Sequence, residues 1–184
     1  MKKVLLFSLL LLTALSVCAY ETIIFHFPDG ELWEPGYYKK RGNEAILQYV
    51  PGGQTSDIWT RSIVVHSYNE NESPAPFFSQ MEIRKMRRIN PTGNYRIIKS
   101  RENDAIFTRC TEDYKEIPAH CEFLRITRAH GGIVTIQYMN RNKKDFENNY
   151  TLWLQVIRDA RLMNSYYRDE RTFDKSEYYE LWSD

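Results

Sequence analysis

The sequence predicts an α+β fold in which an antiparallel β-sheet is flanked by two helices. Three observations lead to this prediction. Short runs rich in β-branched and aromatic residues recur along the chain, separated by connections that contain proline, glycine or asparagine. Two further stretches repeat their apolar residues at helical spacing. The resulting order is β-β-β-α-β-β-β-β-α, and strands joined by short loops favour antiparallel pairing with the helices laid over the sheet.

The first part of the chain supplies the strands that precede the first helix. Residues 21–27 (ETIIFHF) form the first expected strand, and the turn residues PDG end it. Residues 31–44 (ELWEPGYYKKRGNE) are expected to be irregular, with a short hairpin. The second strand, residues 45–51, stops at a proline, and the third spans residues 58–68. The long apolar centre of the third strand predicts burial on both of its faces.

A helix and then a series of strands follow. The helix has apolar residues at helical spacing from Phe77 to Ile89, and the segment INPTGN ends it. Gly131 and Gly132 form the tight turn of the last hairpin. The strand-like runs expected after the helix are residues 95–101, 104–110, 121–129 and 133–141.

The second helix is expected to begin at about Asp145. Its apolar residues recur at i, i+4, i+7, i+11 and i+14, the spacing of a helix face that packs against a sheet. This stripe consists of Phe146, Tyr150, Trp153, Ile157 and Ala160. The charged and aromatic segment from about residue 169 onward is expected to be a loose tail of the domain.

The N-terminal segment MKKVLLFSLLLLTALSVCAY has the pattern of a bacterial secretory signal peptide. Two lysines precede an apolar run that is too short for a stable membrane anchor, and Val17 and Ala19 occupy the −3 and −1 positions of a cleavage site. A lipoprotein at Cys18 is the alternative, although Val17 stands where that motif requires a small residue. We therefore expect residues 1–19 to be removed and residues 20–184 to form a single periplasmic or secreted domain.

The charge of the expected mature chain limits its partners. Loss of the two N-terminal lysines lowers the formal charge from +1 to −1, so no global field attracts the chain to nucleic acid or anionic lipid. No second apolar run approaches transmembrane length. We expect a protein or an envelope component as the partner, with no nucleic acid and no stable membrane span.

Cleavage leaves Cys110 and Cys121, separated by ten residues, with His120 beside the second cysteine. An even pair of cysteines in an oxidising compartment indicates a disulfide, and strand-like runs on both sides suggest neighbouring strand ends. Free thiols and a metal site are the alternatives. A zinc site requires three or four ligands, and only His120 lies near. The disulfide is favoured, and no metal or cofactor is expected.

The segment ILQYVPGGQTSDIWT carries a resemblance to a known fold. A strand that ends in Tyr-Val-Pro, a glycine-containing loop and a Trp-Thr pair at the next strand is similar to small secreted bacterial proteins of the PsbP-like fold. The detailed similarity covers Tyr49 to Thr60, while the order of elements matches over most of the chain. The resemblance implies an antiparallel sheet flanked by helices and an accessory or binding role, with no catalytic residues to transfer.

The aromatic and basic stretch LWEPGYYKK is the candidate binding segment. Aromatic residues on a loop can stack on sugars or anchor a protein partner. They can equally fold back onto the core, which is the expectation for Trp33. The candidate binding residues are Trp33, Tyr37, Tyr38, Lys39 and Lys40.

The helical segment EIRKMRR is a second cationic feature. Its cations, Arg84, Lys85, Arg87 and Arg88, fit an anion-binding or nucleic-acid-binding patch. They fit better a solvated helix face near the helix C-terminus, where the helix dipole favours positive charge.

No catalytic residue is assigned, because the sequence lacks the nucleophile-elbow, zinc-protease, P-loop and dinucleotide-binding motifs. His66 and His120 could serve as a base, although a lone histidine on a strand is more often structural. The leading hypothesis is an exported, non-enzymatic accessory or binding protein. The alternatives are a secreted hydrolase with a carboxylate and histidine site, and a subunit of an envelope or secretion assembly that docks through SEYYELW.

Overall fold

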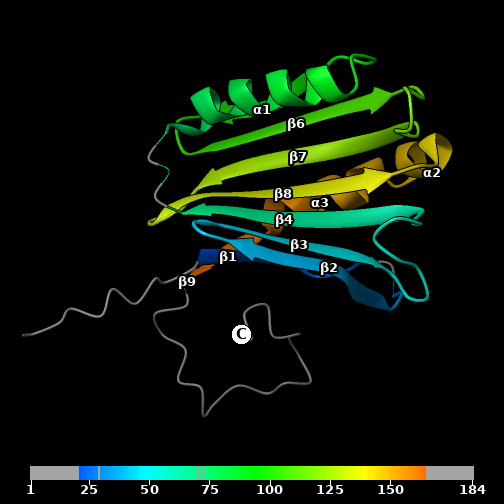
Figure 1. Cartoon of the computed structure of the whole chain (residues 1–184), viewed down its shortest axis with the longest axis horizontal. Helices are drawn as coiled ribbons and strands as arrows, with labels where there is room; N and C mark the ends of the chain where they lie inside the picture. Colours follow the sequence, from blue (N-terminus) through cyan, green and yellow to red (C-terminus); the bar gives the residue numbers. More distant parts are fainter. Residues whose placement is uncertain (1–20, 29, 70, 72, 165–184) are drawn as a thin grey trace, which may run out of the picture.

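The computed structural model describes residues 21–28, 30–69, 71 and 73–164, and its centre is a seven-stranded antiparallel sheet (Figure 1). The strands of this sheet are β2 (Trp33–Arg41), β3 (Glu44–Pro51), β4 (Arg61–Asn69), β5 (Arg96–Arg101), β6 (Asp104–Thr111), β7 (His120–Arg128) and β8 (Gly132–Asn140). Their spatial order is β2-β3-β4-β8-β7-β6-β5. Two runs of consecutive hairpins therefore meet at the β4–β8 pair, and β2 and β5 are the edges.

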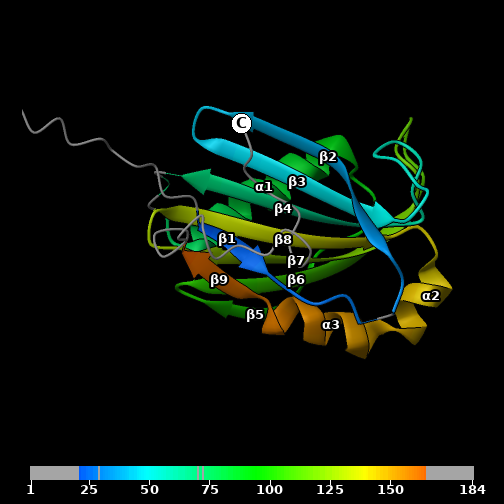
Figure 2. The same ribbon diagram turned by 90° about the horizontal axis from the view of Figure 1, so that it is seen from below.

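Helices lie on both faces of the sheet. Helix α1 (Ala75–Ile89) packs on β5, β6 and β7, whereas α2 (Lys143–Asn148) and α3 (Tyr150–Asp159) pack on β7 and β8 from the other side. Figure 2 shows α1 and α3 on opposite sides of the strands. A two-stranded sheet of β1 (Glu21–Ile24) and β9 (Arg161–Asn164) accompanies α3 and contacts β4 and β8.

The larger hydrophobic core lies between the sheet and α2, α3 and the β1–β9 pair. Trp153 of α3 stacks on Tyr138 of β8 with ring centroids 4.0 Å apart, and Phe123 of β7 packs against Phe146 at 4.8 Å. These four side chains are at most 3% exposed. Burying rings of this size stabilises the fold by several kcal/mol, about 1.5–3 kcal/mol for each fully buried apolar side chain.

Arg125 fastens the C-terminal end of α3 to the sheet. Its guanidinium donates to the main-chain oxygens of Ile157, Arg158 and Ala160, at 2.9, 3.0 and 2.7 Å. These carbonyls would otherwise lack partners at the end of the helix, where a cation is also favoured by the helix dipole. The side chain of Asp104 accepts from Arg125 Nε at 2.8 Å and holds it in place.

The smaller core lies under α1. Ala75 and Phe78 of the helix pack against apolar side chains of the sheet, and the Phe78 ring meets the Tyr68 ring edge-on at 4.8 Å. The sheet side chains of this core are Ala105, Phe107, Leu124, Ile126 and Ile133. All except Ile133 come from β6 and β7, so α1 seals only one side of its face of the sheet.

The structure confirms the α+β class and the antiparallel pairing. Two expected strands are shorter: the first ends at Ile24 instead of residue 27 and pairs with β9 outside the main sheet, and the third begins at Arg61 instead of residue 58. The structure differs from the expected elements in three further places. Residues 31–44 are not irregular, because β2 pairs with β3 along nearly its whole length, with a register shift between Pro35 and Tyr37. Gly36 fits this shift, since a Cβ there would lie 3.0 Å from a methyl group of Val50. A bulge at proline and glycine explains why the sequence did not look like a regular strand.

The late helix is divided, and a short strand follows it. Asn149 separates α2 from α3, and its side-chain amide donates to the main-chain oxygen and a carboxylate oxygen of Asp145. An asparagine that binds the preceding turn competes with helix continuation. The flank therefore contains three helices rather than two, and β9 was missed because four residues give little periodicity.

The third difference concerns the strand 58–68, which was expected to be buried on both faces. In β4, Ile63 and Val65 are buried, but Val64 and His66 on the other face are only half-buried. The apolar run of β4 therefore packs into the core on one face and stays partly accessible on the other.

The expected signal peptide, the lipoprotein alternative at Cys18 and the tail from residue 169 lie outside the described residues. In the described part of the chain, no helix is long and apolar enough to cross a membrane.

Candidate functional site

The candidate site is the part of the sheet that lies on the α1 side but beyond the reach of α1. We call this surface the open face; its residues are Tyr37, Lys39, Ile46, Val64, His66 and Gln137. In Figure 1, α1 runs along the upper edge of the sheet above β6, and no described helix lies in front of β4, β3 and β2. The surface covered by α2, α3 and the β1–β9 pair is called the closed face.

The strand register places the open-face residues in rows that run across the sheet. Tyr37 is opposite Gln48, Gln48 is opposite Val64, and Val64 is opposite Gln137, so these side chains are lateral neighbours on one face. Leu124 follows Gln137 in the same row and is 5% exposed under α1, whereas Tyr37 at the other end is 40% exposed. Between these two ends, Val64 and Gln137 are half-buried and Gln48 is 9% exposed, so the row is most accessible at Tyr37.

The next row contains the titratable group of the open face. Lys39, Ile46 and His66 are opposite one another on β2, β3 and β4. The His66 ring stacks on Tyr68 at 3.9 Å, and its Nε2 atom lies 3.6 Å from a carboxylate oxygen of Glu44. Burial lowers the pKa of His66 below 6.5; Glu44 opposes this effect and Lys85 adds to it. His66 is therefore neutral near pH 7.

Positive charge borders the open face on two sides. On the edge strand β2, Lys39 and Arg41 are exposed. On α1, the cations Arg84, Lys85, Arg87 and Arg88 are exposed, and Lys85 lies close enough to β4 to influence His66. Among the described residues, the only ion pair of these six cations joins Lys85 to Glu82, at 3.5 Å.

A buried charge network lies where the open face meets the α1 core. Glu122 on β7 is fully buried, and its carboxylate binds Nε of Arg109, which is 2.6 Å away, the hydroxyl of Tyr95 and the side-chain amide of Gln137. The Arg109 guanidinium also stacks over the Tyr95 ring at 4.5 Å. Gln137 therefore connects the open face to the buried carboxylate.

Glu122 is charged in this environment. Burial alone would raise its pKa, but the His120 ring, the Arg109 guanidinium and the Tyr95 hydroxyl lower the pKa to about 2. Nδ1 of His120 lies 3.0 Å from the main-chain oxygen of Pro118, which can only accept, so Nδ1 carries a hydrogen. Its Nε2 atom is buried without a hydrogen bond, 3.8 Å from Glu122.

This network suits structural anchoring better than proton transfer. A general acid or base needs a pKa near the working pH and access to substrate. Glu122 has neither, because its pKa is about 2, its side chain is 0% exposed, and three donors occupy its oxygens. The pair Arg109–Glu122 instead fixes β6 against β7 beneath the end of α1.

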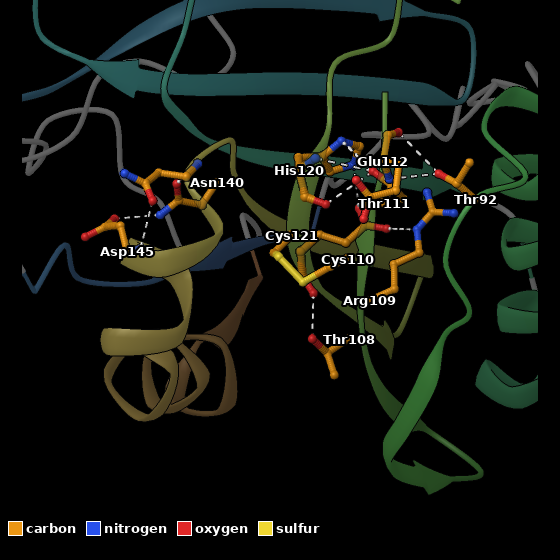
Figure 3. Close-up of a disulfide and its surroundings, with 12 residues drawn as sticks. Thr92, Thr108, Arg109, Cys110, Thr111, Glu112, His120, Cys121, Asn140 and Asp145 are labelled. Atoms are coloured by element: carbon orange, nitrogen blue, oxygen red, sulfur yellow. Dashed lines mark hydrogen bonds and ion pairs between the residues drawn. A yellow bond between two sulfur atoms is a disulfide. The ribbon is translucent and has the colours of Figure 1, made fainter. Parts of the chain in front are cut away.

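The disulfide predicted between Cys110 and Cys121 is confirmed, and it supports this network (Figure 3). The two cysteines are directly opposite on β6 and β7, at the closed-face core. Arg109 and Glu122, one residue away on each strand, point to the other face. The covalent link therefore holds together the same two strand ends that carry the buried ion pair.

The structure separates the five candidate binding residues instead of gathering them on a loop. Trp33 is 3% exposed in the closed-face core and stacks on Phe27 with ring centroids 4.9 Å apart. This agrees with the expectation that Trp33 folds back onto the core. Tyr37 and Tyr38 are each 40% exposed, but they lie on opposite faces of β2 because strand side chains alternate. Lys39 shares the open face with Tyr37, and Lys40 lies on the Tyr38 side.

Several residues of the site were not predicted from the sequence. Ile46 belongs to the second expected strand, whose faces were not assigned, Val64 to the strand predicted to be buried on both faces, and Gln137 gave no signal of its own. Glu122 could have been noticed, because a carboxylate within the apolar run CEFLRITRA predicts a buried charge that needs a partner. The structure also brings together two cationic segments that were noticed separately in the sequence, because β2 and α1 lie at the borders of the open face.

Among the described residues, no group of three or more histidine, cysteine, aspartate or glutamate side chains could hold a metal ion. Comparison of the chain with protein-family models, with curated proteins and with solved structures gives no significant match.

Proposed function

We propose that this chain is an exported, non-enzymatic accessory or binding protein with one PsbP-like domain, and that the open face is its recognition surface. The observation that carries the proposal is a patch on β2, β3 and β4 that α1 does not cover, where the Tyr37 ring is 40% exposed and Ile46 and Val64 are half-buried. Accessible aromatic and aliphatic side chains on a rigid sheet are typical of binding surfaces.

Two further features support the proposal. The Cys110–Cys121 bond fits an oxidising compartment outside the cytoplasm. An antiparallel sheet with helices on both faces is also what the PsbP-like resemblance implies. The hydrolase alternative receives less support, because the carboxylate beside His120 is buried and fully engaged.

A capture experiment with matched variants tests the recognition surface. The mature chain serves as bait for a native envelope fraction, beside the pair Tyr37→Ala with Lys39→Ala on the open face. The control pair, Leu152→Ala with Lys144→Ala, removes one exposed apolar side chain and one exposed lysine from the helices of the closed face. We expect the wild type and the control to capture the same protein and the open-face pair to lose it. Equal capture by all three baits would place recognition elsewhere.

A further inference from the structure

We propose that the occupant of the open face is an acidic segment of a partner protein, in which carboxylate side chains accompany apolar ones. This inference rests on the proposed recognition role and assigns the chemistry of the ligand. It is drawn from the charges and apolar groups that border and line the open face.

The charge on the borders is positive and mostly uncompensated. Lys39 and Arg41 on β2 have no ion-pair partner among the described residues. On α1, Lys85 is the cation that lies close enough to β4 to influence His66, and the exposed Arg84, Arg87 and Arg88 add positive charge elsewhere on the helix. This concentration does not follow from the composition of the protein, because residues 20–184 carry a formal charge of −1. Acidic groups on a partner would be attracted to both borders and would dock faster at low ionic strength.

Two carboxylates lie near the open face. Glu82 lies 3.5 Å from Nζ of Lys85 and forms an ion pair with it. Glu44 lies 3.6 Å from Nε2 of His66, but the neutral imidazole does not compensate its charge. The exposed cations Lys39 and Arg41 outnumber this single carboxylate, so an acidic partner fits the surface better than a cationic one.

The apolar lining indicates that charge alone does not describe the occupant. Ile46 and Val64 form a half-buried strip at the centre of the open face, beside the exposed ring of Tyr37. Across from it on α1, Met81 and Ile89 are 40% and 45% exposed, and each lies one helical turn from Lys85. Apolar side chains of a partner would bury these groups at roughly 25 cal/mol for each Å² removed from water.

Fluorescence anisotropy with defined probes tests the ligand class on the full mature chain. The probe is a labelled decapeptide in which glutamate alternates with valine or phenylalanine. The comparison probes are the same peptide with lysine in place of glutamate, poly-glutamate and a heparin oligosaccharide. We expect the acidic apolar peptide to bind most tightly, and its affinity to fall as salt is raised.

Charge-reversal variants locate the binding. The pair Lys39→Glu with Lys85→Glu should weaken binding of the acidic apolar peptide by about tenfold or more, since two exposed attractions become repulsions. The control pair, Lys144→Glu with Arg158→Glu, changes the net charge equally on the closed side and should leave the affinity unchanged. Melting temperatures of both pairs verify that the fold is retained.

Several results would overturn the proposal. Equal binding of the lysine peptide, or equal weakening by both charge-reversal pairs, would show that the borders do not select an acidic partner. Tighter binding of heparin would assign the face to a sulfated polysaccharide. Tighter binding of poly-glutamate would show that the partner needs no apolar side chains. Self-association abolished by the Lys39 and Lys85 reversals would assign it to a second copy. If all probes fail while capture still depends on Tyr37 and Lys39, the recognition role stands and the ligand class is wrong.

Discussion

The closed and open faces belong to the same strands but have different surroundings. In β4, Ile63 and Val65 are 0% and 5% exposed on the closed face, while Val64 and His66 between and beside them remain half-buried on the open face. Hydrophobicity does not distinguish the two faces in the segment RSIVVHSY, because the adjacent residues Val64 and Val65 are identical and lie on opposite faces. The difference between core and surface therefore arises from what packs on each face.

The geometry of helices and strands explains why one face stays partly uncovered. A helix with its side chains is about 10 Å wide and neighbouring strands lie about 4.8 Å apart, so a single helix covers roughly two strands. α1 is the only described helix on its face and packs on β5, β6 and β7. The closed face is covered more widely because the β1–β9 pair lies next to α3 and extends the cover to β4.

The largest effect is expected at the boundary between covered and open surface. Glu122→Gln keeps the shape of the side chain but leaves the buried Arg109 guanidinium without its countercharge, which should cost about 3–5 kcal/mol. Denaturant unfolding measures the loss. Adding Arg109→Met to Glu122→Gln should recover part of it, since the uncompensated charge is removed. If the single variant lost less than about 1 kcal/mol, the pair would not be the anchor described above.

A pair of substitutions in one strand compares the faces directly. Ile63→Ala on the closed face should lower the free energy of unfolding by about 2–5 kcal/mol, because it leaves a cavity in a packed core. Val64→Ala, at the neighbouring position on the open face, should lower it by about 1 kcal/mol or less. Chemical denaturation of the two variants at equal protein concentration gives both numbers. Equal losses would mean that the open face is sealed in solution.

The disulfide should have an intermediate effect on stability. Replacing Cys110 and Cys121 with serine should lower the free energy of unfolding by about 3 kcal/mol in the chain-entropy model, while the fold is kept. Non-reducing mass spectrometry of a digest should show the two peptides linked in the wild type. Full alkylation of the native protein by iodoacetamide without reductant would contradict the bond.

Acid should lower the free energy of unfolding, because the buried carboxylate of Glu122 becomes protonated. The pKa of Glu122 is about 2 in the folded chain, below its ordinary value of 4.5. Between these two pH values, the unfolded chain therefore binds a proton at Glu122 more readily than the folded chain does. Stability from this group is present above about pH 4.5 and is lost as the pH falls toward 2. Asp104 acts in the same direction, since hydrogen bonds from Lys99 and Arg125 outweigh burial and lower its pKa.

Denaturant midpoints over this pH range check the acid dependence. The wild type should change little between neutral pH and about pH 5 and should lose stability below it. Glu122→Gln should show a weaker dependence because the group that titrates is gone. An unchanged slope in the variant would assign the acid sensitivity to other carboxylates, with Asp104 the first to examine.

The sequence was sufficient to predict most of the fold because the signals are local. Alternating strands, the helix from Ala75 to Ile89 and the proline and glycine turns can each be recognised within a few residues. The elements that were wrong are those that local rules do not determine. β2 contains a proline and a bulge, and β9 is defined mainly by pairing with β1, which lies more than a hundred residues earlier.

The open face was harder to predict because no described helix covers it and because the residues that line it come from segments far apart in the sequence. Tyr37 and Lys85 were both noticed, yet the sequence gives no indication that β2 and α1 border one surface. Val64 was predicted to be buried, since its apolar neighbours cannot reveal that α1 packs mainly on β5, β6 and β7 and meets β4 at Tyr68. Such properties depend on strand order in the sheet, which hydrophobic periodicity does not encode.

The smallest effect on stability is expected at Tyr37, and it separates two residues that the sequence placed in one segment. The Tyr37 ring is 40% exposed on the open face, so Tyr37→Ala should change the free energy of unfolding by about 1 kcal/mol or less. Trp33, four positions earlier, is 3% exposed between Phe27 and Trp153, and Trp33→Ala should cost about 3–5 kcal/mol. Thermal unfolding of the two variants measures the contrast, and circular dichroism verifies that each starts folded. A large loss in Tyr37→Ala would show that this ring belongs to the core, and the open face would then begin at β3.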